Sequence, residues 1–477
     1  MRDRRTRPAL PDPLLAEFSD FLAARIGLHF PEPRRADLNC GIDALARELG
    51  FADPEACVRR LMSSELSRVQ VEMLASHLTV GETYFFRERK SFDSLEQHIL
   101  PELIQHRRRA ERRLRIWSAG CCTGEEPYSI AILLARMIPD LRDWNISILA
   151  TDINARFLEK ASRGVYSEWS FRDAPPGIRE TFFRKTGQGR FEIASHVKSM
   201  VTFGYLNLAE DAYPSVESGT NAMDVIFCRN VLMYFEPAHA GRVLENLGRS
   251  LVEDGCLFVS PIEIPQVAVP QLAAVNFSGA VVFRKQSKAP RVAENMVLPV
   301  DISVAREAAP ARAPCQQASD LYGQGRYADA AEKIGESLSR EPADADAMAL
   351  LARACANQGR LAEALDWCEK AVAADKLNPG RHYLLATILQ ELGEPERAAA
   401  ALKRALYLDQ RHALAHFALG NLVRRQGNRK ESERHFRNAL SILDGCPQDQ
   451  VLPESEGITA GRLAEIIRSA VSGEVHA

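Results

Sequence analysis

The chain of 477 residues is long enough for two to four domains, and its 46% apolar and 26% charged residues are typical of soluble globular proteins. The formal net charge of −3 gives no reason to expect nucleic acid or an anionic membrane as a partner. Ten scattered cysteines without a Cys-x-x-Cys pair argue against a metal site and favour the cytoplasm, and we expect neither a secretory signal nor a membrane-spanning segment.

Residues 14–90 are predicted to form a small all-α N-terminal domain. Apolar residues recur there at helical spacing in three successive segments, at 18–26, 42–49 and 66–78. The spacing predicts that these helices pack their apolar faces together as a small bundle.

Residues 91–287 are predicted to form an α/β domain around a parallel sheet, because short apolar strands alternate with helical segments. The expected strands are 115–119, 147–151, 201–203, 224–228 and 256–260, followed by a hairpin-like run at 280–284. The expected helices are 125–137, 155–161 and 238–251. Residues 166–206 break this rhythm with aromatic residues, a glycine-rich turn and a short strand at 190–193, which indicates an inserted antiparallel β-subdomain.

The first strand leads into a turn that suits a ligand. Residues 116–126, Ile-Trp-Ser-Ala-Gly-Cys-Cys-Thr-Gly-Glu-Glu, are predicted to be a strand end, a turn of small residues and a helix start, as at the nucleotide-binding end of a doubly wound sheet. Glu125 and Glu126 would repel a phosphate at this helix N-terminus. They favour a cationic ligand, and S-adenosylmethionine, which carries a sulfonium and an amino group, is the cofactor that we expect.

Further polar residues could face the same ligand. Asp152 ends the second strand and could accept ribose hydroxyls or cap the next helix. Arg229 and Asn230 follow a buried strand and could bind the ligand or form a structural ion pair. Asn207 suits an adenine edge, although asparagine is also common in turns. The segment 81–88, Gly-Glu-Thr-Tyr-Phe-Phe-Arg-Glu, could equally be a core plug with a surface ion pair.

The C-terminal part is predicted to be an all-α solenoid over 316–445, after an Ala- and Pro-rich linker at 288–315 and before a capping helix at 457–473. Stacked helix–turn–helix units explain a 34-residue period, since glycine makes the turn and small residues allow close helix contact. The array resembles tetratricopeptide repeats. The glycines that mark the period are Gly325, Gly359, Gly393 and Gly427.

Taken together and in this order, the motifs resemble the chemoreceptor glutamate methyltransferases of the CheR type. The resemblance covers roughly residues 14–286. With the appended repeats, the chain is similar to the WspC-like members, which serve a surface-sensing, biofilm-linked chemosensory pathway. The resemblance implies a Rossmann-like methyltransferase domain with a small inserted β-subdomain. The matching strings are Gly-Glu-Thr-Tyr-Phe-Phe-Arg at 81–87, Ser-Ala-Gly-Cys-Cys-Thr-Gly-Glu-Glu-Pro-Tyr-Ser at 118–129, Thr-Asp-Ile at 151–153, Asn-Leu at 207–208 and Phe-Cys-Arg-Asn-Val-Leu-Met-Tyr-Phe at 227–235.

The resemblance also implies the site residues. Arg87 and Tyr234 would lie near the transferred methyl as catalytic residues. Gly81 departs from the family, which usually has Asn there, so that contact is missing. Because Thr123 and Glu126 fit a capping box, Glu126 is assigned to the helix start. The residues expected to contact S-adenosylmethionine are Thr83, Arg87, Glu125, Asp152, Asn207, Leu208, Arg229 and Asn230.

The implied activity is methylation of glutamate side chains on a methyl-accepting chemoreceptor. A glutamate carboxylate is already ionised at pH 7, so the reaction needs no general base. Two alternatives stay open: a non-catalytic adaptor with a relic methyltransferase fold, and a dinucleotide oxidoreductase, which the missing Gly-x-Gly-x-x-Gly fingerprint disfavours. The implied partners are a protein bound by the repeats and the cytoplasmic receptor helices, met by a basic N-terminal face of Arg34, Arg35, Arg59, Arg60 and Arg68.

Overall fold

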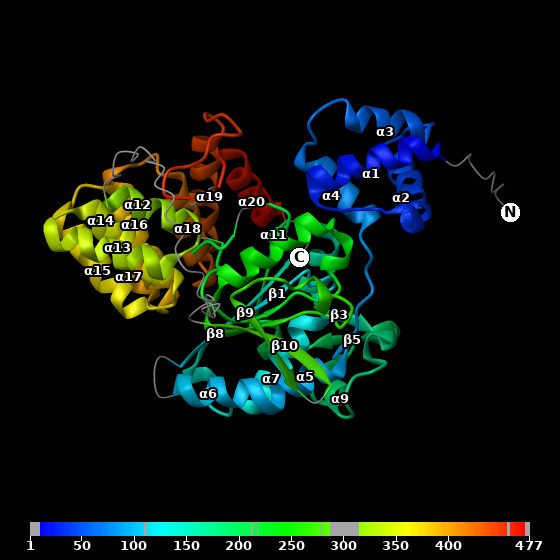
Figure 1. The fold of residues 1–477 in the computed structure, drawn as a ribbon, viewed down its shortest axis with the longest axis horizontal. Coiled ribbons are helices and arrows are strands. Elements are labelled where there is room, and N and C mark those ends of the chain that lie inside the picture. The colour runs from blue at the N-terminus through cyan, green and yellow to red at the C-terminus, as the bar shows by residue number, and fades with distance from the viewer. Residues whose placement is uncertain are drawn as a thin grey trace, which may run out of the picture. The chain divides into compact units, whose positions relative to one another are not determined.

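The protein is described by a computed structural model over residues 10–108, 112–210, 213–216, 218–277, 279–286, 314–455 and 458–472. The chain divides into two compact units: Met1–Asp211 with Met223–Ser287, and Ala212–Ala222 with Lys288–Ala477 (Figure 1). N-terminal helices, a central α/β domain and C-terminal helical repeats confirm the predicted fold class. Residues 288–313 of the predicted linker lie outside the described residues. No helix in the described ranges is both long and apolar enough to cross a bilayer.

The N-terminal part of the first unit is helical, with α1 (Asp12–Ile26), α2 (Arg35–Glu48), α3 (Pro54–Met62) and α4 (Arg68–Leu78). Local rules explain two of the helix starts. The Asp53 carboxylate accepts two backbone N–H groups of α3, and Ser67 forms a capping box with Gln70 at α4. The apolar faces of the helices meet in one core, in which Phe18 and Ile42 are fully buried.

The centre of the first unit is a sheet whose described strands have the order β6-β2-β1-β7-β8-β10-β9. The first five strands of this order run parallel, as predicted, and β10 pairs antiparallel with both β8 and β9. The sequence did not predict β9, because this edge strand exposes Ala274 and Asn276 and lacks the apolar run of a buried strand. The bounds are β1 (Arg113–Ala119), β2 (Asn145–Asp152), β6 (Val201–Tyr205), β7 (Met223–Phe227), β8 (Leu251–Phe258), β9 (Leu272–Phe277) and β10 (Ala280–Lys285).

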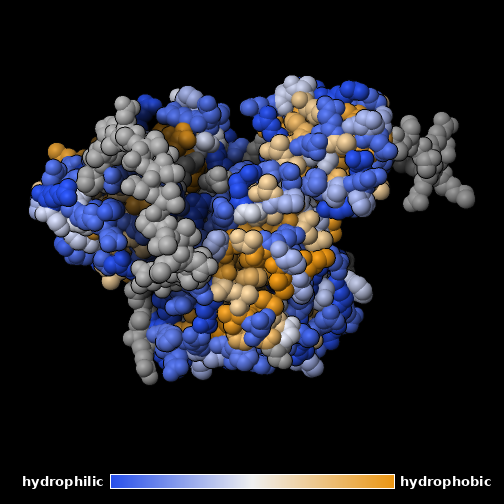
Figure 2. All heavy atoms as spheres, in the orientation of Figure 1, coloured by the Kyte–Doolittle hydropathy of each residue, from blue (hydrophilic) through white to orange (hydrophobic). Residues whose placement is uncertain are grey.

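Helices cover both faces of this sheet. Figure 1 shows α6 and α7 on one side of the sheet and α11 on the other, and Figure 2 shows apolar residues around β9 and β10 on the visible face. Because β1 lies between β2 and β7, the strand order reverses at β1, and ligands of such sheets bind at the carboxyl ends of the strands next to this point. The helices are α5 (Arg89–Ser94), α6 (Leu100–Arg108), α7 (Glu125–Met137), α8 (Ala155–Arg163), α9 (Ile178–Phe182), α10 (Ser195–Lys198) and α11 (Pro237–Ser250).

The predicted insertion contains a separate antiparallel sheet, formed by β3 (Val165–Ser167), β5 (Arg190–Ile193) and β4 (Phe183–Lys185) in that order, which confirms the β-subdomain. Phe85 anchors the segment 81–88 in its core. The ring of Phe85 stacks on Phe171 at 4.9 Å between centroids and meets Phe183 edge-on at 5.0 Å. The core-plug interpretation is therefore right for Phe85, and the flanking Thr83 and Arg87 reach the cavity described below.

The second unit stacks helix pairs, as predicted for tetratricopeptide repeats. The four glycines of the 34-residue period lie between the helices of each pair with φ of 70°, 75°, 75° and 85°, a left-handed conformation that favours glycine. The amide that follows closes each turn, as Arg360 N does on Cys355 O at 2.9 Å. The pairs are α12 (Pro314–Gly323) with α13 (Tyr327–Arg340), α14 (Ala345–Asn357) with α15 (Leu361–Ala374), α16 (Pro379–Glu391) with α17 (Pro395–Leu408), and α18 (Ala413–Arg425) with α19 (Arg429–Leu443).

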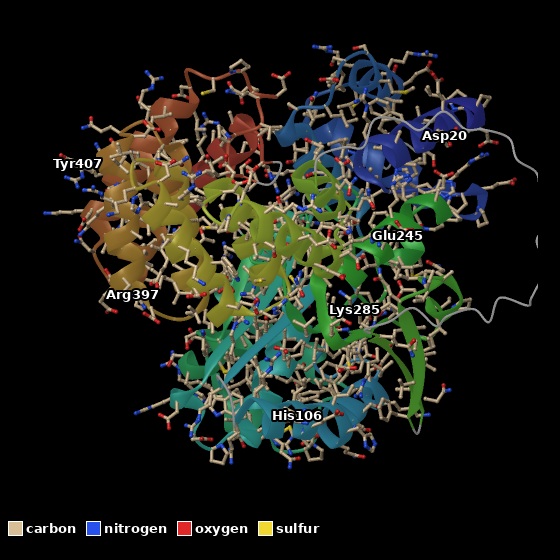
Figure 3. All side chains as sticks on the ribbon, turned by 60° about the vertical axis from the view of Figure 1, so that its left-hand side comes forward. Asp20, His106, Glu245, Lys285, Arg397 and Tyr407 are labelled. Carbon is tan, nitrogen blue, oxygen red and sulfur yellow. The ribbon has the colours of Figure 1, made fainter. Side chains whose placement is uncertain are left out.

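The array is followed by α20 (Ala460–Ser472), within the segment predicted to cap it. This helix packs against α19, and its Leu463 and Ile467 are fully buried in the core of the last repeats. Arg397 and Tyr407 both belong to α17, and the side chain of Tyr407 is 76% exposed (Figure 3).

The short segment Ala212–Ala222, which connects β6 to β7, belongs to the second unit. Val216 lies in the hydrophobic core of the first repeats, and Asn221 Nδ2 donates to the carbonyl oxygen of Ala356 at 3.4 Å. The core of the repeats is therefore completed by residues from outside the predicted repeat range.

A histidine pair is buried between α18 and α19. The Nδ1 atoms of His416 and His435 are 2.9 Å apart, and His416 Nε2 lies 3.2 Å from the carbonyl oxygen of Gln410. Burial lowers the pKa of both imidazoles, and the neighbouring charge of His416 helps to lower the pKa of His435 to about 4. In the folded state these two imidazoles therefore bind a proton only at a lower pH than in the unfolded chain, where histidine binds one near pH 6.5.

We expect the second unit to lose stability in mild acid. Its free energy of unfolding should be highest above about pH 6.5 and fall as the pH drops toward the folded pKa of His435, by on the order of 1 kcal/mol at pH 5. Urea unfolding of the full chain at pH 7.5 and 5.0 measures this change. The variant His435→Leu should lose most of the pH dependence, whereas substitution of the exposed His106 should leave it intact. Equal slopes in both variants would contradict the assignment.

Candidate functional site

A cavity in the first unit lies where the carboxyl ends of β6, β2, β1 and β7 meet. It has a volume of about 980 Å³ and opens to solvent. Ile26 and Leu28 from the N-terminal helical part complete its wall. Eight of the nine predicted site residues line it, namely Thr83, Arg87, Asp152, Asn207, Leu208, Arg229, Asn230 and Tyr234.

Asp152 places a buried carboxylate in this wall. Its Oδ2 accepts the N–H of Cys122 at 2.8 Å, and its Oδ1 accepts the N–H of Asn154 at 2.8 Å. Burial raises the pKa of Asp152 to about 6. The alternative role, capping α8, belongs to Asn154, whose side chain accepts the N–H groups of Arg156 and Phe157. Asp152 therefore keeps acceptor capacity toward the cavity.

Asn207 forms a turn, one of the two roles considered for it, and also lies in the cavity wall. It lines the cavity, but its Oδ1 accepts the N–H of Ala209 at 3.0 Å and its Nδ2 lies 3.4 Å from a carboxylate oxygen of Glu210. The side-chain oxygen thus forms an Asx-type turn after β6. This turn fixes where the chain passes along the cavity wall.

The two glutamates after the β1 turn do not lie as the sequence predicted. The helix α7 begins after Gly124 without a side-chain cap, so the predicted capping box is wrong. Glu125 is 1% exposed, accepts from Thr123 Oγ1 at 2.6 Å and Ser170 Oγ at 3.1 Å, and does not line the cavity. Glu126 does line it.

Helix geometry explains this correction. Consecutive helical residues point about 100° apart, so only one of two neighbouring glutamates can face the strand ends. Glu126 lies one turn before Ile130, on the face of α7 that packs against the sheet, and its Oε1 accepts from Ser118 Oγ at 2.7 Å. The apolar periodicity of residues 130–137 therefore contained a signal for Glu126.

Arg229 is the most buried cation of the cavity wall, with 2% of its side chain exposed. Its Nε lies 3.3 Å from Glu126 Oε2 and 3.9 Å from Glu88 Oε2, and its Nη2 donates to the backbone carbonyl of Arg87 at 2.6 Å. The structural ion pair considered from the sequence is therefore present. Its Nη1, however, is buried and has no hydrogen-bond partner within the described residues. Such a donor suits an anionic group of a ligand.

Tyr234 is held by the N-terminal part, a contact that the sequence did not predict. The backbone N–H of His29 donates to the backbone carbonyl oxygen of Tyr234 at 2.8 Å. The Arg34 guanidinium lies 4.7 Å from the centre of the Tyr234 ring. Burial raises the pKa of the phenol, with Arg34 and Arg87 opposing this shift, so Tyr234 is a hydroxyl donor at neutral pH. Arg34, predicted above to be part of a basic receptor-facing surface, also stacks on the candidate catalytic tyrosine.

The turn after β1 brings two thiols to the cavity. Burial, together with the charge of Asp152, raises the pKa of both Cys121 and Cys122. Protonated thiols are poor nucleophiles, which supports their interpretation as small turn residues.

Residues 81–264 match the family described as CheR methyltransferase, SAM binding domain, and residues 315–379 and 383–449 match tetratricopeptide repeats. A probable chemotaxis protein methyltransferase of Rhizobium etli is 36% identical over 220 residues, which are 46% of this chain and 80% of that protein. The chain belongs to the CheR methyltransferase family. The resemblance inferred from the motifs is thereby confirmed.

Two further relatives are similar to this CheR-family chain. A chemotaxis protein methyltransferase of Borreliella burgdorferi is 31% identical over 239 residues, which are 50% of this chain and 83% of that protein. The probable biofilm formation methyltransferase WspC of Pseudomonas aeruginosa is 33% identical over 277 residues, which are 57% of this chain and 62% of that protein. The chain is therefore a methyltransferase, its methyl donor is S-adenosylmethionine, and the oxidoreductase alternative has no support.

The cavity of this CheR-family chain fits that donor on physical grounds of its own. The unpartnered Nη1 of Arg229 suits the carboxylate of the methionine part, and Asp152 suits the ribose hydroxyls. Glu126 and Asp152 beside the start of α7 disfavour a phosphate. A Cβ at Gly81 would lie 2.9 Å from the ring of Phe157, so a larger residue at position 81 would require this cavity-lining ring to move.

Proposed function

We propose that the protein transfers a methyl group from S-adenosylmethionine to glutamate side chains on the cytoplasmic helices of a methyl-accepting chemoreceptor, giving glutamate methyl esters. The observation that carries this proposal is the meeting of Arg87 and Tyr234 with the proposed cofactor residues in one cavity. The relatives named as chemotaxis and biofilm formation methyltransferases support a chemosensory, biofilm-linked pathway. We place the reaction in the cytoplasm, where the receptor helices of this proposal lie. The repeats are proposed to bind a further protein.

The donor site is proposed to use the predicted residues with one replacement, Glu126 in place of Glu125. When bound, S-adenosylmethionine supplies an electrophilic methyl group on a sulfonium. Arg229 binds its carboxylate, Asp152 accepts from its hydroxyls, and Glu126 adds negative charge near its cationic part. The remaining contacts of the proposed set are Thr83, Arg87, Asn207, Leu208 and Asn230.

The glutamate that accepts the methyl group needs hydrogen-bond donors to position it rather than a general base. An incoming glutamate carboxylate is ionised at neutral pH and holds the electron pair that would form the new C–O bond. The bond between the methyl carbon and the sulfonium sulfur would break at the same time, and the electron pair of that bond would leave with the sulfur of S-adenosylhomocysteine. Arg87 is proposed to hold this carboxylate through its guanidinium, and Tyr234 through its hydroxyl. These two donors orient one carboxylate oxygen for in-line attack, and positioning supplies the catalysis.

The proposal is tested with methyl-labelled S-adenosylmethionine and cytoplasmic domains of candidate receptors. We expect label on receptor glutamates, released by base as methanol, and we compare the full chain with a chain ending at residue 287. A protein that binds S-adenosylhomocysteine but labels no receptor would refute the proposed acceptor. A protein that fails to bind it by calorimetry would refute the donor site and favour the adaptor alternative.

Affinity for the cofactor should decrease in mild acid because of Asp152. Its pKa of about 6 leaves the carboxylate ionised at pH 7.5 and largely protonated at pH 5, where it accepts ribose hydroxyls less well. If only the ionised form binds, the dissociation constant of S-adenosylhomocysteine rises roughly tenfold over this range. Calorimetry at both pH values measures it. The variant Asp152→Asn should bind weakly at pH 7.5 with little further change at pH 5, and a steep profile in that variant would point to another group.

A further inference from the structure

A carboxylate outside the cavity organises the loop that follows β7. Glu263 lies after β8, is 0% exposed and does not line the cavity. Its Oε1 accepts the N–H of Val231 at 2.7 Å and of Met233 at 3.3 Å. Its Oε2 accepts the N–H of Asn230 at 2.9 Å, and both the N–H and the hydroxyl of Ser260, at 3.0 and 2.5 Å.

The loop held by this carboxylate carries much of the proposed site. Residues 229–234 contribute Arg229, Asn230, Val231 and Tyr234 to the cavity wall. Asn230 adopts a left-handed backbone conformation, with φ of 58°, which turns successive amides of the loop toward the same side. Three buried amides that point at one place need an acceptor there.

The same loop packs against the turn after β1. A Cβ at Gly120 would overlap the Val231 side chain, so the turn after β1 and the 229–234 loop are in tight van der Waals contact. A change in the path of the 229–234 loop would therefore displace Arg229 and Tyr234 and disturb the turn that carries the cavity-lining Cys122.

We propose that Glu263 is a positioning residue for methyl transfer, which holds the amides of residues 230, 231 and 233 so that Arg229 and Tyr234 face the cavity together. This inference rests on the function proposed for that cavity. Glu263 acts through the backbone of the loop and touches neither donor nor acceptor. The carboxylate is needed because both of its oxygens accept N–H groups from the loop, whereas a glutamine would direct its own N–H₂ at one of the two sets of donors.

The test compares Glu263→Gln with the parent full-length chain. We expect the dissociation constant of S-adenosylhomocysteine to rise about tenfold and kcat to fall about a hundredfold, with an acceptor KM that stays within threefold. A purely structural role would instead lower activity only in proportion to the unfolded fraction. Assays are therefore run well below the melting temperature of each variant. The variant Glu263→Asp, which keeps the charge but withdraws it by one methylene, should be intermediate.

The outcomes separate this inference from the proposed function. A Glu263→Gln variant with dissociation constant and kcat both within twofold of the parent overturns the positioning role. If that variant does not fold, Glu263→Asp decides by the same criterion. If the parent binds S-adenosylhomocysteine but methylates no receptor, the proposed acceptor fails, and the dissociation constants alone still test Glu263.

Discussion

Replacing Arg229 with alanine is expected to weaken binding of S-adenosylhomocysteine by a factor of about a hundred, or roughly 3 kcal/mol. The substitution removes a buried guanidinium whose free Nη1 suits the ligand carboxylate, and it leaves Glu126, whose side chain is 13% exposed, without its cationic partner. Because the Arg229 charge now opposes the rise in the Glu126 pKa that burial causes, Glu126 should also become harder to ionise. Calorimetric titration measures the affinity.

The paired variant Arg229→Met with Glu126→Gln separates binding from folding. It removes both charges at similar volume, so thermal stability should recover relative to Arg229→Ala while affinity stays low. Arg242→Ala, at an exposed position of α11, should leave both quantities unchanged. Parent-like affinity in the paired variant would mean that Arg229 is structural only.

The second large effect is expected at Arg87. Its Nη1 donates to the backbone carbonyl of Glu82, and its guanidinium lies 5.9 Å from the centre of the Tyr84 ring, so the side chain is held at the cavity wall. Arg87→Ala should lower kcat with receptor about 10²- to 10³-fold, because a donor aimed at the reacting carboxylate is lost. Arg87→Lys keeps the charge without the planar fork and should be intermediate. Methyl incorporation under saturating donor measures kcat.

A matched control for Arg87 is the variant Arg89→Ala. The Arg89 side chain is 54% exposed and pairs with Asp93 at 3.7 Å. This control should keep parent activity. If Arg87 and Tyr234 hold the same carboxylate, the combination of Arg87→Ala and Tyr234→Phe should cost less than the product of the single effects. A combined Arg87→Ala and Tyr234→Ala chain that still sustained pathway output would favour the adaptor alternative.

The sequence by itself determined the repeats and eight of the residues that line the cavity. The roles of Gly325 and its three counterparts could be predicted because a left-handed turn is a local requirement that recurs with each helix pair. The positions of Asp152 and Arg229 in the cavity wall could be predicted because each lies at the end of an apolar strand. The carboxyl ends of parallel strands share one edge of the sheet. Both features depend on residues close together in the chain.

Only the tertiary structure decided which side chains support this wall and how. It placed Glu126 rather than Glu125 in the cavity wall, brought Arg34 onto the ring of Tyr234, and directed Glu263 at the loop of residues 229–234. The physical reason is the same in each case. The role of these side chains depends on their direction and on partners from distant segments, and burial then fixes the contact because an unpaired buried charge is costly.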